Sequence, residues 1–173
     1  MKKVLVIGSG GREHAIVYQL SRSKQVGQIF CAPGNAGIAQ LAECVAIKDT
    51  EVEALLAFAK ENEVDLCVVG PEAALNAGVA DVFREAGIPV FGHSKAATQI
   101  EASKEFAKEL MAKYNVPTAA FRSFANYEEA MAYVRERNTY PAVLKYDGLA
   151  AGKGVVIAQD EKEADETLRD MLV

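Results

Sequence analysis

A lysine-bearing loop rich in small residues has the most specific chemical pattern in the sequence. Residues 145–155 are Lys-Tyr-Asp-Gly-Leu-Ala-Ala-Gly-Lys-Gly-Val, with apolar, strand-like segments on both sides. The spacing around Lys153 differs from the Gly-x-x-x-x-Gly-Lys-Ser/Thr pattern of a P-loop, and a strand instead of a helix follows. Such a hairpin can close over nucleotide phosphates, whose charge Lys145 and Lys153 would neutralise. We therefore expect residues 146–154, the hairpin loop, to bind a nucleotide.

A second phosphate-type pattern, Gly-Ser-Gly-Gly at residues 8–11, lies between a β-branched run and a helical pattern. This glycine turn would direct backbone N–H groups and the positive end of a helix dipole towards an anion. Glu13 stands where the dinucleotide fingerprint needs its third glycine, and the expected acid after the second strand is missing, which disfavours NAD. Arg12 could pair with a phosphate, and Glu13 with a ribose hydroxyl or an amine. Solvated first-turn residues are the alternative.

Two more turn-forming segments follow expected strands. The asparagine loop, residues 33–37, is Pro-Gly-Asn-Ala-Gly, and the acidic loop, residues 70–72, is Gly-Pro-Glu. In open α/β sheets, ligands bind at the carboxyl ends of the strands. These loops and the glycine turn would together form a cup for a phosphosugar. Ordinary turn chemistry is the alternative interpretation.

The first part of the chain alternates between short β-branched runs and helical patterns, which favours an α/β fold with an open parallel sheet and helices on both faces. The expected strands lie at residues 4–7, 28–32, 45–47, 65–69 and 89–91, and the expected helices at 12–21, 51–62 and 78–86.

The pattern changes after residue 92 to a smaller α+β module. We expect strands at residues 120–124, 142–145 and 154–158. Helices should begin after the capping residues Ser103, Asn126 and Asp160, the last two with a glutamate three positions on. The helix after Ser103 should run through Lys113 and carry four apolar residues on one face: Phe106, Ala107, Leu110 and Met111. The final helical pattern reaches Val173 without a C-cap, so we expect the chain to be part of a longer polypeptide.

Composition excludes some classes of partner. The net charge is −5 and half of the residues are hydrophobic, so neither a nucleic acid nor an anionic membrane is an expected partner. The apolar run at residues 4–7 is too short for a signal peptide. Three cysteines without Cys-x-x-Cys spacing indicate reduced, buried thiols, and a cytoplasmic location is expected.

Four motifs together resemble the phosphoribosylamine–glycine ligase family. In chain order they are Gly-Ser-Gly-Gly-Arg-Glu-His at 8–14, Ala-Pro-Gly-Asn-Ala-Gly at 32–37, Val-Gly-Pro-Glu at 69–72 and Asp-Gly-Leu-Ala-Ala-Gly-Lys-Gly-Val at 147–155. The resemblance implies a pre-ATP-grasp (Rossmann-like) domain at residues 1–102 and the incomplete start of an ATP-grasp domain at 103–173. It also implies ATP-dependent ligation of glycine to 5-phosphoribosylamine, a step of purine biosynthesis, through a glycyl phosphate.

The resemblance also implies roles for individual residues. Substrate-binding positions would be Gly8, Gly10, Gly11, Arg12, Glu13, Pro33, Gly34, Asn35, Gly37 and Glu72. ATP-binding positions would be Lys104, Lys145, Asp147, Gly148, Leu149, Ala150, Ala151, Gly152, Lys153 and Gly154.

The resemblance implies ATP with Mg²⁺, or Mn²⁺ as an alternative. The metal ligands and the main catalytic residues would lie beyond Val173, with no metal site in this fragment, so the fragment alone should be inactive. The expected oligomeric state is a monomer. Tyr146 stands where the family has a small residue, which leaves the local lid geometry open.

Three alternatives remain. An oxidoreductase would need a complete dinucleotide fingerprint. Another ATP-grasp ligase or carboxylase would share the lysines and the glycine lid. A non-catalytic phosphosugar- or nucleotide-binding module would bind without turnover.

Overall fold

The computed structural model describes residues 1–150 and 153–173, and it divides into two compact units, Met1–Gln99 and Ile100–Val173. The first unit contains β1 (Lys2–Gly8), α1 (Gly11–Ser21), β2 (Val26–Pro33), the short 3₁₀ helix η1 (Ile38–Gln40), β3 (Glu43–Cys44), α2 (Val52–Glu61), β4 (Leu66–Val69), α3 (Glu72–Ala77), α4 (Val79–Glu85) and β5 (Val90–Phe91). Helix α5 (Lys95–Ala102) contains the division between the units.

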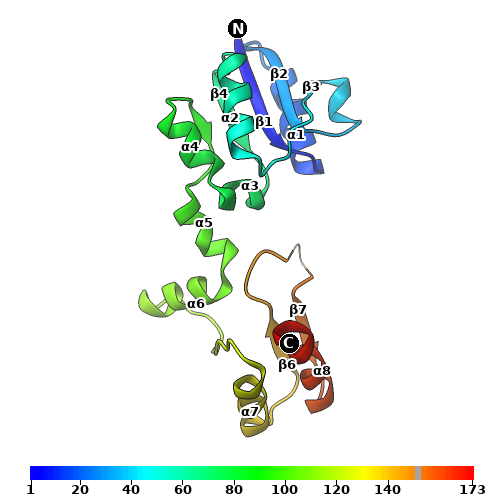
Figure 1. Ribbon diagram of the computed structural model, residues 1–173, viewed down its shortest axis with the longest axis vertical. Helices are drawn as coiled ribbons and strands as arrows, with labels where there is room; N and C mark the ends of the chain where they lie inside the picture. Colours follow the sequence, from blue (N-terminus) through cyan, green and yellow to red (C-terminus); the bar gives the residue numbers. More distant parts are fainter. Residues whose placement is uncertain (151–152) are drawn as a thin grey trace. The chain divides into compact units, whose positions relative to one another are not determined.

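All five strands of the first unit are parallel and lie in the order β3-β2-β1-β4-β5 (Figure 1). Alternate residues of β1 point to opposite faces, as the period of a strand requires. Leu5 and Ile7 pack in a core with α2 and α4, whereas Val4 and Val6 pack with Val17 of α1 on the other face. The expected parallel sheet with helices on both faces is therefore confirmed, and it brings the carboxyl ends of β1, β2 and β4 to one edge.

The second unit contains α6 (Lys104–Lys113), α7 (Tyr127–Arg137), β6 (Ala142–Lys145), β7 (Val155–Ala158) and α8 (Glu161–Leu172). Strands β6 and β7 form an antiparallel pair, and a small core of Ala130, Met131 and Leu168 joins α7 to α8. The three capping expectations are confirmed by side-chain oxygens that accept backbone N–H groups. Ser103 accepts from Phe106 at 3.1 Å, Asn126 from Glu129 at 2.9 Å, and Asp160 from Glu163 at 2.9 Å.

Two of the strand predictions made from the sequence are wrong. The third strand lies at Glu43–Cys44 instead of residues 45–47, where Val45 and Ile47 pack against the core from a loop. Residues 120–124 form no strand, and the Phe124 ring instead packs against Tyr133, with ring centroids 5.3 Å apart. In both places, apolar residues that favour a strand pack through their side chains, although Val45 still donates its N–H to the carbonyl of Cys31 at 2.9 Å.

Helix α6 ends at Lys113, as expected, but its apolar residues form no buried face. No residue of this helix is buried, and Phe106 is exposed. The sequence analysis also missed helices α3 and α5, which are short, at six and eight residues, and so give a periodic pattern little length in which to show.

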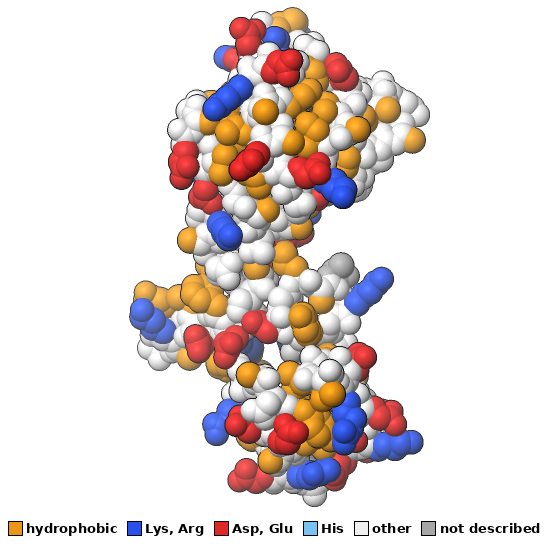
Figure 2. Space-filling view, in the orientation of Figure 1, with side chains coloured by type: hydrophobic (Ala, Val, Ile, Leu, Met, Phe, Trp, Pro, Cys, Tyr) orange, Lys and Arg blue, Asp and Glu red, His pale blue; other side chains and the backbone are white. Residues whose placement is uncertain are grey.

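Within the described residues, no helix is long and apolar enough to cross a membrane. Acidic and basic side chains are interspersed over the visible face of each unit (Figure 2).

Candidate functional site

The glycine turn lies between β1 and α1. Gly8 has a φ of +127°, a conformation that favours glycine, and Gly10 is the extended N-cap residue of α1. The amides of Gly11 and Arg12 lie in the first turn of the helix, where N–H groups have no intrahelical partner. The turn thus presents backbone donors at the positive end of a helix dipole.

Glu13 lies under this turn instead of facing solvent. Its side chain is almost fully buried, with the whole residue 3% exposed. One carboxylate oxygen accepts the N–H of Gly10 at 2.7 Å, and the other accepts Nε–H of Arg12 at 3.0 Å. Both oxygens therefore have partners within the protein, and the Gly10 amide is already in use. This geometry makes Glu13 a residue that positions the turn.

Three glycines make room for the Glu13 side chain. A Cβ at Gly8 would lie 2.7 Å from Cδ of Glu13, and one at Gly10 would lie 2.9 Å from its Oε2. A Cβ at Gly70, in the acidic loop, would overlap the same carboxylate. By contrast, a Cβ at Gly11 would meet no atom within 4 Å. The glycines at 8, 10 and 70 are thus required by one buried carboxylate.

Arg12 connects the glycine turn to the acidic loop. Its Nη1 donates to Oε1 of Glu72 at 2.9 Å, and Nη2 lies 3.5 Å from Oε2, so the ion pair is bidentate. The hydrogen bonds from Arg12 lower the pKa of Glu72, and those to Glu72 and Glu13 raise the pKa of Arg12. Arg12 keeps a fixed positive charge beside the turn's amides.

Asn35 connects the asparagine loop to the glycine turn. Its Oδ1 accepts the N–H groups of Gly37 at 2.8 Å and Ile38 at 2.9 Å, while Nδ2 donates to the carbonyl of Ser9 at 2.8 Å. Gly34 N–H also donates to the carbonyl of Gly8 at 3.1 Å. The structure therefore brings the glycine turn, the asparagine loop and the acidic loop together, and we call these three segments the loop cluster.

In the second unit, Asp147 lies at the N-terminus of α6. One oxygen accepts the N–H of Lys104 at 2.5 Å and that of Glu105 at 3.2 Å, and the other lies 3.1 Å from Oγ of Ser103. Nζ of Lys104 donates to the carbonyl of Gly148 at 2.8 Å. Lys104, Asp147 and Gly148, expected from the sequence to bind ATP, thus lie together, and Asp147 occupies the anion-favouring end of the helix.

The β6–β7 pair has an exposed apolar face that includes Lys145. Lys145 pairs with Val155, and Val143 pairs with Ile157, so these four side chains point to one side. Val143 and Ile157 are each 55% exposed and Val155 is 45% exposed. The sequence analysis missed this face, although the strand-favouring alternation around Lys145 could have indicated it.

The hairpin loop accommodates Tyr146. The N–H of Tyr146 donates to the carbonyl of Gly154 at 2.8 Å, and Lys153 N–H donates to that of Ala150 at 2.8 Å. The Tyr146 ring lies beside Gly148, whose φ is +129° and whose Cβ, if present, would be 3.3 Å from the ring. Leu149 is exposed. Ala151 and Gly152, both expected to bind ATP, lie outside the described residues.

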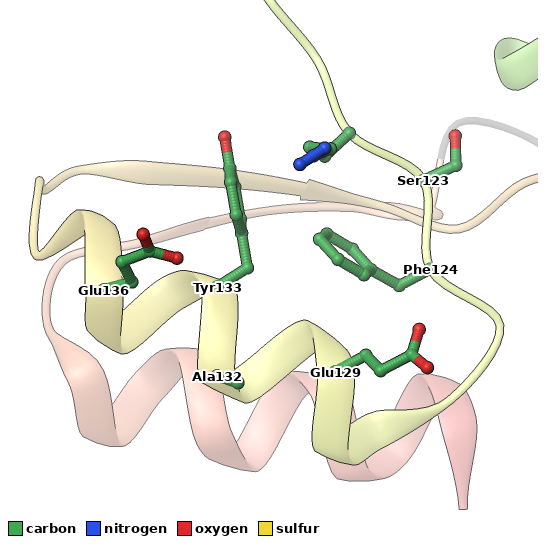
Figure 3. A pocket seen from close by; sticks show the side chains of 7 residues that line it. Ser123, Phe124, Glu129, Ala132, Tyr133 and Glu136 are labelled. Carbon is green, nitrogen blue, oxygen red and sulfur yellow. The ribbon is translucent and has the colours of Figure 1, made fainter.

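A separate hollow lies on α7 (Figure 3). Glu129 and Glu136 flank Tyr133 on this helix, the Phe124 ring closes one side, and the Arg122 guanidinium lies 5.6 Å from the Tyr133 ring centroid. The hollow contains none of the residues expected to bind ATP or substrate. We assign it no part in the site.

The described residues contain no group of three or more His, Cys, Asp or Glu side chains placed to hold a metal ion.

Two family models match the chain and define its class of protein. Residues 102–173 match the family model described as the phosphoribosylglycinamide synthetase ATP-grasp (A) domain, and residues 2–101 match its N domain. The second unit thus belongs to an ATP-grasp domain and follows an α/β unit with an open parallel sheet. The chain belongs to the phosphoribosylglycinamide synthetase family.

Relatives of known name agree with this assignment. The chain is 54% identical over 170 residues to phosphoribosylamine–glycine ligase of Caldanaerobacter subterraneus, and 49% identical over 172 residues to that of Vibrio cholerae. Each alignment covers 98% of this chain but only 40% of the relative, so the chain spans about 40% of the length of these relatives.

Solved structures support the fold. Phosphoribosylamine–glycine ligase of Thermotoga maritima matches with a TM-score of 0.74 and 33% identity, covering 95% of this chain and 38% of that one. The biotin carboxylase domain of Hydrogenobacter thermophilus 2-oxoglutarate carboxylase matches with a TM-score of 0.78 and 21% identity, covering 98% of this chain and 40% of that one, which shows the fold alone.

Proposed function

We propose that this chain is part of an enzyme that joins glycine to 5-phosphoribosylamine with ATP, giving glycinamide ribonucleotide, ADP and phosphate in purine biosynthesis. The observation that carries the proposal is the roughly half-identical match to ligases of that name over almost the whole chain. The grouping of the loop cluster at one sheet edge supports it, because sheet edges of this kind bind ligands.

The loop cluster would hold the phosphosugar. Amides at the start of α1 would receive the phosphate, Arg12 would add a fixed positive charge, and Glu13 would hold the turn in shape. Glu72 would keep Arg12 oriented through their bidentate ion pair. Asn35 would keep the asparagine loop against the turn through Ser9.

The second unit would hold ATP. Lys104, Lys145 and Lys153 would neutralise phosphate charge, and the hairpin loop would close over the phosphates. The exposed apolar face around Lys145 would lie against the base. Lys104 would exchange its bond to the Gly148 carbonyl for a phosphate oxygen.

The chemistry requires activation of glycine. A carboxylate is a poor electrophile, so transfer of the γ-phosphoryl group of ATP to the glycine carboxylate supplies a leaving group. The amine of 5-phosphoribosylamine then attacks the carbonyl, releases phosphate and forms the amide. Positioning and charge stabilisation would be the protein's main contributions. Mg²⁺, or Mn²⁺, would be held by residues outside this chain.

We further propose that the boundary between the two domains lies between Ala102 and Ser103, because Ser103 caps α6. We also propose a cytoplasmic location, which is consistent with free thiols at all three cysteines. A monomeric state is a further proposal.

Assays of the longer protein that contains this chain test the function. ADP formation should require both glycine and 5-phosphoribosylamine. Bicarbonate-dependent ADP formation without glycine would instead establish the carboxylase alternative. Calorimetric binding of ATP or a phosphoribosyl compound without turnover would indicate a binding module, and binding of NAD an oxidoreductase.

A further inference from the structure

Two cysteines lie side by side at the edge of the first sheet. Cys31 of β2 and Cys44 of β3 occupy paired positions of adjacent parallel strands, and the carbonyl of Cys31 accepts the N–H of Val45 at 2.9 Å. Paired residues point to the same face, and adjacent strands lie about 4.8 Å apart. Disulfides join Cα atoms about 4.4–6.8 Å apart, so a short movement of the two-residue strand β3 can connect these thiols.

Each of the two sulfurs also contacts the loop cluster. The Cys31 thiol donates to the carbonyl of Gly8 at 3.4 Å, and the same carbonyl accepts the N–H of Gly34. Cys44 Sγ lies 3.7 Å from the carbonyl of Asn35, and a Cβ at Gly34 would overlap this sulfur. The two thiols therefore lie directly under the glycine turn and the asparagine loop.

The two thiols differ in access. Cys44 is exposed, whereas Cys31 is fully buried and its burial raises the pKa of the thiol to about 12. An oxidant in solution therefore reaches Cys44 first. Cys67 is also buried, but it packs in the core on the opposite face of the sheet, away from Cys31. It provides an internal control.

We propose that Cys31 and Cys44 form a redox-active dithiol, a modification site that a small disulfide such as glutathione disulfide converts into an intramolecular disulfide. The Cys44 thiolate attacks one sulfur of the oxidant, releases one glutathione and forms a mixed disulfide. The Cys31 sulfur then attacks the Cys44 sulfur, and the Cys31 proton passes to the departing glutathione thiolate, which leaves as the second glutathione. Two protein thiols are oxidised while one glutathione disulfide is reduced to two glutathione molecules.

Formation of the Cys31–Cys44 disulfide changes the loop cluster. Cys31 loses the S–H that donates to Gly8, and Cys44 moves from its place against Gly34. The glycine turn and the asparagine loop both lose a support. Weaker phosphosugar binding in the oxidised form follows from this loss, and this consequence alone rests on the function proposed above.

Peptide mass mapping after incubation of the chain with glutathione disulfide tests the chemistry. The expected product is a peptide cross-linked between Cys31 and Cys44, absent in Cys44→Ser and retained in Cys67→Ala. Substitution of Cys44 should leave the circular dichroism spectrum unchanged, because the residue is exposed. A stable glutathione adduct at Cys44 alone, a dimer linked through Cys44, or a cross-link to Cys67 would overturn the proposal.

Amide hydrogen exchange tests the effect on the loops without any ligand. Exchange at Gly10 and Gly34 should become faster in the disulfide form and return to its original rate after reduction; unchanged exchange would overturn the loop effect. Binding of ribose 5-phosphate should weaken at least about fivefold on oxidation, the lower end of typical coupling between sites. If the reduced chain fails to bind this probe, the proposed function is at fault and the exchange result still decides the dithiol's effect.

Discussion

In the first unit, both faces of the sheet are covered by helices, whereas in the second unit the β6–β7 pair leaves one face exposed. The loop cluster is held by internal hydrogen bonds that Glu13 accepts and that Arg12 and Asn35 donate. The apolar face around Lys145 has no such cover in the described part of the chain. The difference teaches that the chain's own residues hold the loop cluster in shape, whereas the face around Lys145 is left open to a further partner; under the function proposed above, that partner is the nucleotide.

The largest expected effect concerns turnover. The 173-residue chain should show no glycine-dependent ATP hydrolysis, since it spans about 40% of its relatives and its described residues offer no metal cluster. A coupled assay for ADP, with and without glycine, measures this. The longer protein that contains the chain is the positive control. Glycine-dependent turnover by the chain alone would contradict the comparison between the two units.

The next largest effect is expected in the glycine turn. Gly8→Ala forces an L-residue to a φ of +127° and against Glu13, which should destabilise the fold by about 1–3 kcal/mol and abolish phosphosugar binding. Urea unfolding and calorimetry with ribose 5-phosphate measure the two effects. Gly11→Ala is the matched control, because its Cβ meets open space. Equal destabilisation of the two variants would rule out the role assigned to Glu13.

A smaller and more selective effect is expected on the exposed face. Ile157→Asn should change the stability of the chain by less than about 0.5 kcal/mol, because the residue is exposed. In the longer protein it should weaken ATP binding by roughly tenfold, the cost of losing about one large apolar contact. Val116→Asn, at an exposed position outside the β6–β7 pair, should leave ATP affinity unchanged. Unchanged ATP affinity in Ile157→Asn would show that this face does not contact the nucleotide.

The smallest effect is a pH dependence at Glu72. Arg12 lowers the pKa of this carboxyl below its usual 4.5, so the pair stabilises the fold above that pH and the stabilisation is lost as pH falls through the lowered value. Because both side chains are partly exposed, Glu72→Gln should cost less than about 1 kcal/mol at neutral pH.

That cost should disappear in strongly acidic solution. Urea unfolding at several pH values measures it, with Glu53→Gln, at an exposed position of α2, as the control. A difference between parent and Glu72→Gln that grows on acidification would contradict the sign of the effect.

Much of the fold could be predicted because local signals and tertiary packing agree. Asn126 and Asp160 precede apolar stripes and do cap α7 and α8. Residues 4–7 are apolar throughout and form the centre of a strand buried on both faces. Where the strand was misplaced, near Val45, packing of a loop against the core imitates the pattern of a strand.

The grouping of the three loops could also be predicted, since parallel strands bring their carboxyl ends to one edge. The inward direction of Glu13 could not, because a polar residue in a first turn has the same spacing whether it faces solvent or the sheet. Likewise, the sequence gives no sign that Lys104 bonds to the carbonyl of Gly148, which depends on how the hairpin loop bends towards α6.

The buried Glu13 carboxylate has an evolutionary consequence. Gly10 and Gly70 have backbone angles open to other residues, and the nearest atoms to an added Cβ at each belong to Glu13, so the volume of Glu13 favours glycine there. A smaller residue at position 13 would release that constraint. Among distant relatives, substitutions at positions 10, 13 and 70 should therefore arise as correlated sets, while position 8 stays fixed by its own dihedral angle.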